Sequence, residues 1–151
     1  MTPDLKALHR ALAEAVFFAE DPRSIEKIVA STHELHQSVI AGLAPGRGGA
    51  VWAVEKLRAS FGKAYLQIED QIQTGDLCYT RLTAQLQHSG RLGAARPTGK
   101  WVKLTAMVIS RFEAGKARQT WIETNDLDIL RQLDAFELKP SASTSPAREE
   151  A

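Results

Sequence analysis

The chain contains 151 residues, and its 19 basic and 18 acidic side chains give a formal net charge of +1. This length predicts one domain, over residues 1–138, followed by a disordered tail rich in Ser and Pro over residues 139–151. The balanced charge argues against nucleic acid or a membrane as partner, and no apolar run could span a bilayer. The single cysteine excludes an intramolecular disulfide, and the N-terminus lacks a secretory pattern, so we expect a cytoplasmic protein.

The first half of the sequence has apolar residues at helical spacing in three stretches. A break at Asp21-Pro22 separates the first two stretches, and a loop rich in glycine over residues 44–49 precedes the third. The period of residues 31–40 is ambiguous. The predicted helices cover residues 3–20, 24–30 and 51–61.

The second half changes to the side-chain alternation of extended chains. Turn residues such as Gly75-Asp76, and a loop over residues 89–99, separate four strand-like runs. The predicted strands cover residues 65–73, 77–88, 101–112 and 116–124. A short closing helix is expected over residues 126–133. Helices followed by consecutive antiparallel strands predict an α+β fold.

One face of the last predicted strand combines aromatic and polar side chains. By alternation, Gln119, Trp121, Glu123 and Asn125 point to the same side of the sheet. A carboxylate and two amides beside an aromatic wall suit a small-molecule pocket. The alternative is the solvated outer face of a half-exposed sheet, and alternation does not choose between the two.

Four histidines are candidates for proton transfer or metal binding. His9 lies among charged residues of the first helix and is expected to be exposed. His33 and His36 are three residues apart and share a side if their segment is helical, but without a cysteine-rich or H-E-x-x-H pattern we expect no metal site. His88 ends a predicted strand beside a glycine-containing loop, which suggests a proton carrier at a pocket mouth or, equally, a surface residue.

Short motifs recur in a fixed order from the first helix to the closing helix. His36 comes first and is followed by a helix that ends near Phe61. The later motifs are Glu69–Asp76, Arg81–Thr83, His88–Gly90, Pro97–Lys100, Arg111–Lys116, Trp121 and Leu130–Leu133. As a set, these motifs cover roughly residues 5–135. In order and spacing the chain resembles the SnoaL-like polyketide cyclases of the nuclear transport factor two-like superfamily.

The resemblance implies helices packed on a strongly curved, mixed and mostly antiparallel sheet that forms a cone with an internal pocket. It also implies a homodimer and an enzyme that needs no cofactor. In such cyclases an acidic residue near the end of the last strand acts as general acid and base in an intramolecular aldol closure. The pocket folds the substrate into a reactive conformation.

The sequence departs from the family at the acidic position. Counted back from Gln132-Leu133, this position falls on Asn125, whose amide cannot take a proton as a carboxylate does. Asp126 stands next to it. Three explanations stay open: a one-residue bulge turns Asp126 inward, the acid is lost, or its role passes to Glu123, His36 or His88.

The leading hypothesis is a cofactor-independent enzyme acting on a hydrophobic, carbonyl-bearing, natural-product-like small molecule by acid/base catalysis. The catalytic candidates are His36, His88, Asp126 and Glu123, with Asn125 as a donor to a developing oxyanion. The binding candidates are Trp121, Arg81, Gln119 and Phe61. The alternatives are a non-catalytic binding or accessory protein and, with less support because no Asp-Arg-Asp triad is evident, an epoxide hydrolase or isomerase.

Overall fold

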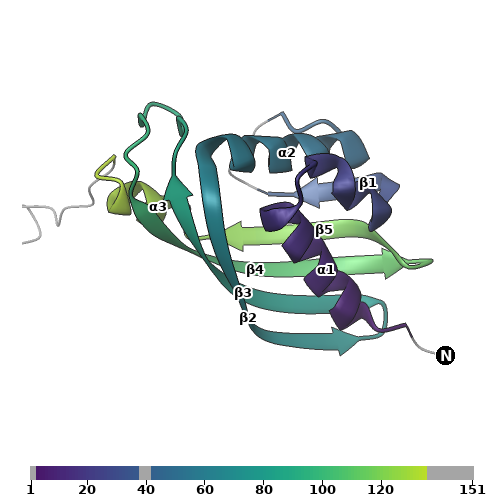
Figure 1. The fold of residues 1–151 in the computed structure, drawn as a ribbon. Coiled ribbons are helices and arrows are strands. Elements are labelled where there is room, and N and C mark those ends of the chain that lie inside the picture. The colour runs from purple at the N-terminus through teal and green to yellow at the C-terminus, as the bar shows by residue number, and fades with distance from the viewer. Residues whose placement is uncertain (1–2, 38–41, 136–151) are drawn as a thin grey trace, which may run out of the picture.

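The computed structural model describes residues 3–37 and 42–135 (Figure 1). The predicted disordered tail over residues 139–151 lies outside the described residues. Helices and strands follow in the order α1 (Leu5–Phe18), a 3₁₀ helix (Pro22–Lys27), β1 (Val29–His36), α2 (Arg47–Ser60), β2 (Phe61–Thr74), β3 (Leu77–His88), β4 (Trp101–Glu113), β5 (Lys116–Thr124) and α3 (Asp126–Gln132).

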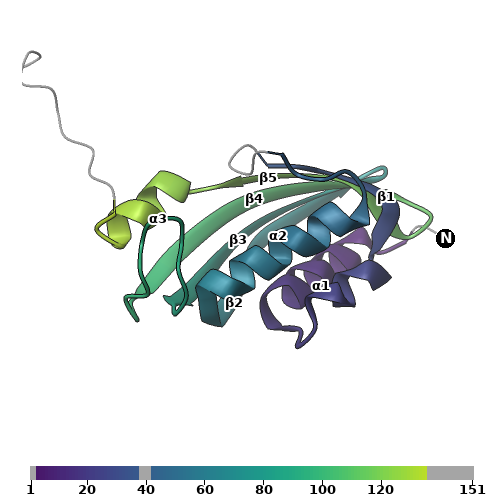
Figure 2. The same ribbon diagram turned by 90° about the horizontal axis from the view of Figure 1, so that it is seen from above.

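The strands form one five-stranded sheet in the order β1-β5-β4-β3-β2. β1 runs parallel to β5, and the other neighbouring strands are antiparallel. Seen from above, the sheet is curved, α1 and α2 lie on the same side of it, and α3 lies beyond the end of β5 (Figure 2). The predicted α+β fold, with N-terminal helices on a curved mixed sheet, is therefore confirmed.

The predicted limits of β3 and β5 agree with the structure, because turn residues define where both strands begin and β5 ends at a helix start. The sequence does not predict β1. Its pairing with β5 shifts register between Val29 and Glu34, so the alternation of side chains is lost there. The predicted helix over residues 24–30 is also wrong, since this segment contains the end of the 3₁₀ helix and the start of β1.

α2 begins within the segment that was expected to be a loop. Its first residue is Arg47, and the following glycines belong to its first turn. A Cβ at Gly49 would lie 2.0 Å from the carbonyl oxygen of Ala44, so the close approach of this loop to α2 requires glycine. Composition alone therefore misplaced the start of the helix.

α1 begins at a side-chain cap and buries one stripe of residues. Asp4 Oδ1 accepts a hydrogen bond from the amide of Ala7 at 3.0 Å. The buried residues of the helix are Leu5, His9, Leu12 and Phe17. His9 is only 2% exposed, so the expectation of an exposed His9 is wrong. Four residues after Leu5, it falls on the apolar stripe despite its charged neighbours in sequence.

The core lies between the helices and the inner face of the sheet. On β3 every second side chain from Cys78 to His88 is buried, and the inner face of β4 likewise carries even-numbered residues. Cys78 is fully buried in a cluster that includes Leu5, Phe112 and Ala117. Burial raises the pKa of its thiol.

A bulge in β5 determines which of its side chains face the helices. The pairing of β4 with β5 shifts register after Arg111, so that Arg118 is an extra residue on β5. Ala117 and Thr120 are consequently both buried, although they are three residues apart. Beyond the bulge, the inner face of β5 carries the even-numbered residues Thr120, Ile122 and Thr124.

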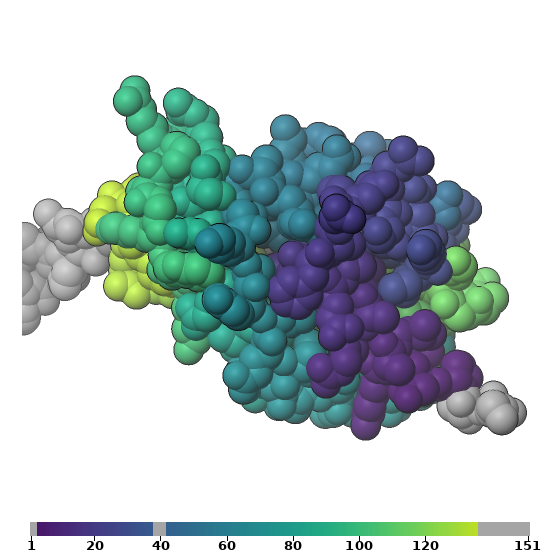
Figure 3. Space-filling view, in the orientation of Figure 1, coloured from purple at the N-terminus to yellow at the C-terminus, as the bar shows by residue number. Residues whose placement is uncertain are grey.

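The loop between β3 and β4 projects from the body of the molecule (Figure 3). Its base is bound to the end of α2, because the amides of Ser89 and Gly90 both donate to the carbonyl oxygen of Ser60, at 3.1 and 3.0 Å. A Cβ at Gly90 would lie 1.7 Å from the carbonyl oxygen of Ala59, so this position requires glycine. The base of the loop is thus fixed against α2.

Candidate active site

A cavity of about 650 Å³ lies between the inner face of the sheet and the helices. This volume is typical of small-molecule sites. α1, α2, β1, β3, β4, β5, α3 and the β3–β4 loop all contribute to its wall. Its apolar lining includes Leu12, Val16, Phe17, Val54, Leu57, Phe61, Leu82, Leu104, Val108, Ile122 and Ile129.

Besides Gln37, Lys56, Ser60 and Arg91, which lie elsewhere in the wall, polar side chains gather at two places along β5. The first, which we call the histidine end, consists of His9, His33, Thr80 and Thr120. The second, the aspartate end, consists of Thr124 and Asp126. Thr124 follows Thr120 by four residues of extended chain, which corresponds to about 13 Å. No direct hydrogen bond can join the two ends.

At the aspartate end, Asp126 is the first residue of α3 and is partly exposed. Thr124 Oγ1 donates a hydrogen bond to Asp126 Oδ1 at 2.6 Å. Among the described residues, Thr124 is the only one whose side chain forms a hydrogen bond with the Asp126 carboxylate. Asp126 follows Thr124 by two residues and lines the cavity, so beyond the bulge at Arg118 no second bulge is needed to turn it inward. The position one residue earlier, which the family comparison favoured, belongs to the outer side.

Asn125 connects α3 to β4 instead of facing the cavity. Its Oδ1 accepts from the amide of Thr105 at 2.9 Å, and its Nδ2 donates to the carbonyl oxygen of Lys103 at 3.0 Å and to Asp128 Oδ2 at 3.1 Å. Gln132 forms a second pair of hydrogen bonds with the backbone of Lys103. These two amide side chains therefore continue the ladder of β4 past the end of β5.

At the histidine end, one chain of hydrogen bonds crosses from α1 to β1. Thr80 Oγ1 is 2.6 Å from His9 Nδ1, and His9 Nε2 is 3.1 Å from Ser110 Oγ. Ser110 Oγ is 2.8 Å from Thr120 Oγ1, which is 2.9 Å from His33 Nε2. All five residues are at most 4% exposed. The chain is thus closed to solvent along its length.

Both histidines of this chain are neutral at pH 7. Burial lowers the pKa of His9 from 6.5 to about 4. Burial also lowers the pKa of His33 to about 4, with a further lowering from His36 and an opposing effect of Glu34. The histidine end therefore presents uncharged imidazoles that can donate and accept hydrogen bonds.

The polar face predicted for the pocket lies on the outer side of the sheet. Gln119 donates from Nε2 to Glu34 Oε2 at 3.2 Å, and Glu123 is exposed. Trp121 stacks on His36 with ring centroids 5.1 Å apart. The prediction that these residues share a face is correct, but the cavity is on the opposite face, so His36 and Trp121 do not line it.

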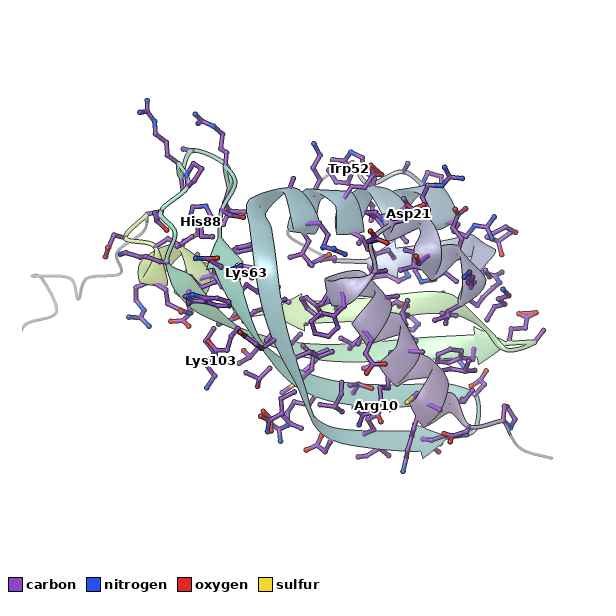
Figure 4. All side chains as sticks on the ribbon, in the orientation of Figure 1. Arg10, Asp21, Trp52, Lys63, His88 and Lys103 are labelled. Atoms are coloured by element: carbon purple, nitrogen blue, oxygen red, sulfur yellow. The ribbon has the colours of Figure 1, made fainter. Side chains whose placement is uncertain are left out.

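Two further candidates lie away from the cavity. Arg81 is on the outer face of β3 and forms an ion pair with Asp70 at 2.9 Å. His88 is fully buried at the base of the β3–β4 loop (Figure 4), where its Nδ1 is 3.0 Å from Thr98 Oγ1 and its ring packs on Phe61. Of the nine candidate residues, the structure brings Phe61 and Asp126 to the cavity wall.

The chain of hydrogen bonds at the histidine end was not predicted from the sequence. Its hydroxyl members, Thr80, Ser110 and Thr120, resemble ordinary strand residues. A signal was present for His9, which falls on the apolar stripe of α1. His33 gave none, because the irregular pairing of β1 hides its inward orientation.

Two further features bear on the site. Within residues 3–37 and 42–135, no group of three or more His, Cys, Asp or Glu side chains is arranged to hold a metal ion. In the same ranges, no helix has the length and apolar character needed to cross a membrane.

Several solved structures share this fold. TsrD from Streptomyces laurentii has a TM-score of 0.75 and 21% identity, over 89% of this chain and 100% of that chain. IdmH from Streptomyces antibioticus, described as a proposed polyketide cyclase, has a TM-score of 0.75 and 24% identity, over 87% and 99%. AclR from Streptomyces galilaeus, described as a proposed hydroxylase, has a TM-score of 0.70 and 20% identity, over 94% and 95%.

At these identities the similarity shows a common fold and leaves activity open. No curated protein sequence is significantly similar to the chain. The family model of the SnoaL-like polyketide cyclases, however, matches residues 7–133, and the resemblance seen in the sequence motifs is confirmed. The chain therefore belongs to the SnoaL-like polyketide cyclase family.

Proposed function

We propose that the protein is a cofactor-independent enzyme that closes a ring in a hydrophobic, carbonyl-bearing small molecule by an aldol-type reaction. One observation carries this proposal: a carboxylate, Asp126, lies in the wall of a mainly apolar cavity that has the volume of a small-molecule site. A carboxylate in such surroundings suits a general base.

In the proposed reaction, Asp126 takes a proton from the carbon next to a ketone. The resulting enolate carbon attacks a second carbonyl of the same molecule, forming a carbon–carbon bond, and the new alkoxide receives a proton back from Asp126. Substrate and product are isomers, so the carboxylate is restored. Thr124, through its 2.6 Å hydrogen bond to Oδ1, orients the carboxylate.

The apolar wall contributes by folding a flexible substrate so that its two reacting carbons meet. Phe61 and the aliphatic side chains of the lining exclude water from the ring-forming part of the molecule. Among the described residues that line the cavity, Asp126 is the only one with an acidic side chain. We therefore assign it the proton transfer for which His36, His88 and Glu123 were also candidates.

We also propose a homodimer that forms through the outer face of the sheet and operates in the cytoplasm. Large apolar side chains on that face are exposed, namely Tyr65, Ile72, Tyr79, Trp101 and Met107. A patch of this kind on β2, β3 and β4 favours burial against a second copy. Light scattering after gel filtration measures the mass, and a monomer would contradict this assembly.

A diketone probe tests the proposed activity. 1-(2-Naphthyl)hexane-1,5-dione can cyclise to a six-membered hydroxyketone, and its rate is followed by chromatography. We expect the Asp126→Asn variant to lose about 100- to 10,000-fold in enzymatic rate. Glu123→Gln is the matched control, because Glu123 is exposed on the outer face of the same segment. Equal rates for wild type and Asp126→Asn would exclude the proposed base.

A non-catalytic binding protein is the second candidate function. The observation that favours it is that, among the described residues, no imidazole forms a hydrogen bond with Asp126, so the carboxylate lacks an adjoining proton carrier. Binding of the diketone without cyclisation, in wild type and Asp126→Asn alike, would be the result expected of this alternative.

A further inference from the structure

We propose that Lys56 and Arg91 bind a carboxylate of the substrate at the mouth of the cavity, so that the apolar part of the molecule enters first. The ketone in this substrate rests on the proposed function. The charge of the substrate and the direction in which it enters follow from the cavity wall itself. Both residues thus determine which substrates the cavity accepts.

The cavity is closed at one end and open at the other. The four side chains of the histidine end are at most 4% exposed. Lys56, Arg91 and Gly93 also belong to the wall but are exposed, and Asp126 is half-buried. In both ribbon views the end of α2, the β3–β4 loop and α3 lie at the same end of the molecule (Figures 1 and 2). A ligand therefore enters there, between these three elements.

Contacts at the end of α2 bring the two cationic residues to the same side of the mouth. Lys56 precedes Ser60 by four residues on α2, so their side chains are neighbours on the helix surface. Ser60 Oγ donates a hydrogen bond to the carbonyl oxygen of Arg91 at 2.9 Å. The Ser60 carbonyl oxygen in turn accepts from the two loop amides that precede Arg91. The backbone of Arg91 is therefore fixed beside Lys56, and two side chains of this length can reach one ligand group.

The positive charges of this pair are available to a ligand. Within residues 3–37 and 42–135, neither Lys56 nor Arg91 forms an ion pair. Lys56 Nζ lies 5.3 Å from the centroid of the exposed Trp52 ring, which orients the ammonium group without neutralising it. Because both histidines of the wall are neutral at pH 7, its charged groups are two cations and the Asp126 carboxylate. The excess positive charge favours an anionic group of the ligand.

A carboxylate matches these donors and explains the direction of entry. The Arg91 guanidinium can donate two parallel hydrogen bonds to a carboxylate, and the Lys56 ammonium can donate a third. The mainly apolar lining further in cannot solvate a charge, and burying an unpaired ion is costly. The carboxylate consequently stays at the mouth, while the ketone and the apolar part of the substrate occupy the interior.

Two probes of matched shape test the preference for a carboxylate. 4-(2-Naphthyl)-4-oxobutanoate and its primary amide have nearly the same shape, but only the first is charged at pH 7.5. In titration calorimetry we expect the carboxylate to bind about 2- to 30-fold more tightly, as two exposed ion pairs predict. The preference should decrease when NaCl is raised from about 0.05 M to about 0.5 M. Equal affinities, tighter binding of the amide, or failure of both probes to bind overturns the proposal.

Substitutions at the mouth assign the preference to the two residues. We expect Lys56→Gln and Arg91→Gln each to reduce the carboxylate preference and the double variant to lose it. Lys63→Gln and Arg96→Gln are the matched controls, because they remove the same charges from exposed positions outside the cavity wall, Arg96 in the same loop as Arg91. The control variants should keep the wild-type preference. A preference that persists in the double variant, or that falls equally in the controls, contradicts the proposal.

The same probes separate this inference from the proposed function. Asp126→Asn removes the acidic group of the wall and should therefore increase the carboxylate preference, although it is expected to abolish most turnover. A wild type that cyclises the neutral diketone but does not prefer the carboxylate contradicts only the present inference. A wild type that prefers the carboxylate through Lys56 and Arg91 but cyclises nothing supports this inference and contradicts the proposed catalysis.

Discussion

The two ends of the cavity differ in what holds their polar groups. At the histidine end, each side chain is buried and joined to the next by a hydrogen bond, from Thr80 to His33. At the aspartate end, Asp126 is partly exposed and is bound by Thr124. The side chains of the first end are fixed in orientation within the core, whereas the second end holds the carboxylate to which we assign the proton transfer. Substitutions should therefore affect folding at one end and chemistry at the other.

Acidification should break the histidine end and gives the largest expected effect. The pKa of His9 and of His33 is lowered from 6.5 to about 4 in the folded protein. Between these values the unfolded chain binds more protons, so stability falls as pH decreases from 6.5 towards 4. Each histidine accounts for about 3 kcal/mol of this loss. Urea denaturation at pH 7, 6, 5 and 4.5 measures it.

His9→Gln and His36→Gln provide the matched comparison for this effect. His36 is 44% exposed at its side chain, so His36→Gln should retain most of the acid sensitivity of wild type. His9→Gln should lose part of it. Glu34 and His36 both act on His33, with opposite effects on its pKa. A stability that does not change between pH 7 and 4.5 would contradict the assignment of neutral buried histidines.

Removal of the His9 side chain gives the next largest effect. His9→Ala leaves a cavity in the core and leaves Thr80 and Ser110 without their partner. We expect a loss of about 3–4 kcal/mol in the free energy of unfolding at pH 7. Arg10→Ala, one residue along α1 on its exposed side, should change stability by less than about 0.5 kcal/mol. Similar losses in both variants would argue against the buried chain.

Asn125 tests how α3 is attached, with a smaller expected effect. Asn125→Ala removes three hydrogen bonds to Thr105, Lys103 and Asp128. We expect about 1–2 kcal/mol of destabilisation and a reduced rate with the diketone, because Asp126 follows directly. Asn125→Asp keeps the acceptor for the Thr105 amide but places a carboxylate oxygen against the Lys103 carbonyl and the Asp128 carboxylate, so it should lose at least as much. A variant as stable as wild type would show that α3 docks without these contacts.

The smallest change in stability is expected at the aspartate end. Asp126→Asn preserves shape and can still accept the hydrogen bond from Thr124. We expect a change below about 0.5 kcal/mol in the free energy of unfolding, in contrast to the large loss of rate proposed for this variant. Thermal denaturation measures the difference. A strongly destabilised Asp126→Asn would remove the distinction between the two ends.

Much of the fold was predictable because turns and alternation are local. Glycine-containing turns bound β3 and β5, and their residue limits follow from the sequence. Family motifs then identified the architecture, which the match over residues 7–133 confirms. β1 was not predictable, since its register shift depends on pairing with β5, a strand about 90 residues further along the chain.

The site was less predictable, for two physical reasons. Alternation divides β5 into two faces but does not say which face meets the helices, and the bulge at Arg118 makes that choice. The polar and aromatic face containing Trp121 is outside, where it contacts β1. In addition, His9 on α1 and His33 on β1 find partners on β4 and β5, 101 and 87 residues away in sequence. Such contacts leave no local pattern.

The rate at which a reagent labels the buried thiol of Cys78 would report how often the fold opens locally. Cys78 pairs with Ser110 across β3 and β4, so it lies directly beside the hydrogen-bond chain. Because it is fully buried and burial raises the pKa of its thiol, a thiol reagent can reach it only when this part of the sheet separates from α1. Its labelling rate would therefore measure how often the histidine end opens, and no cysteine would have to be introduced for the experiment.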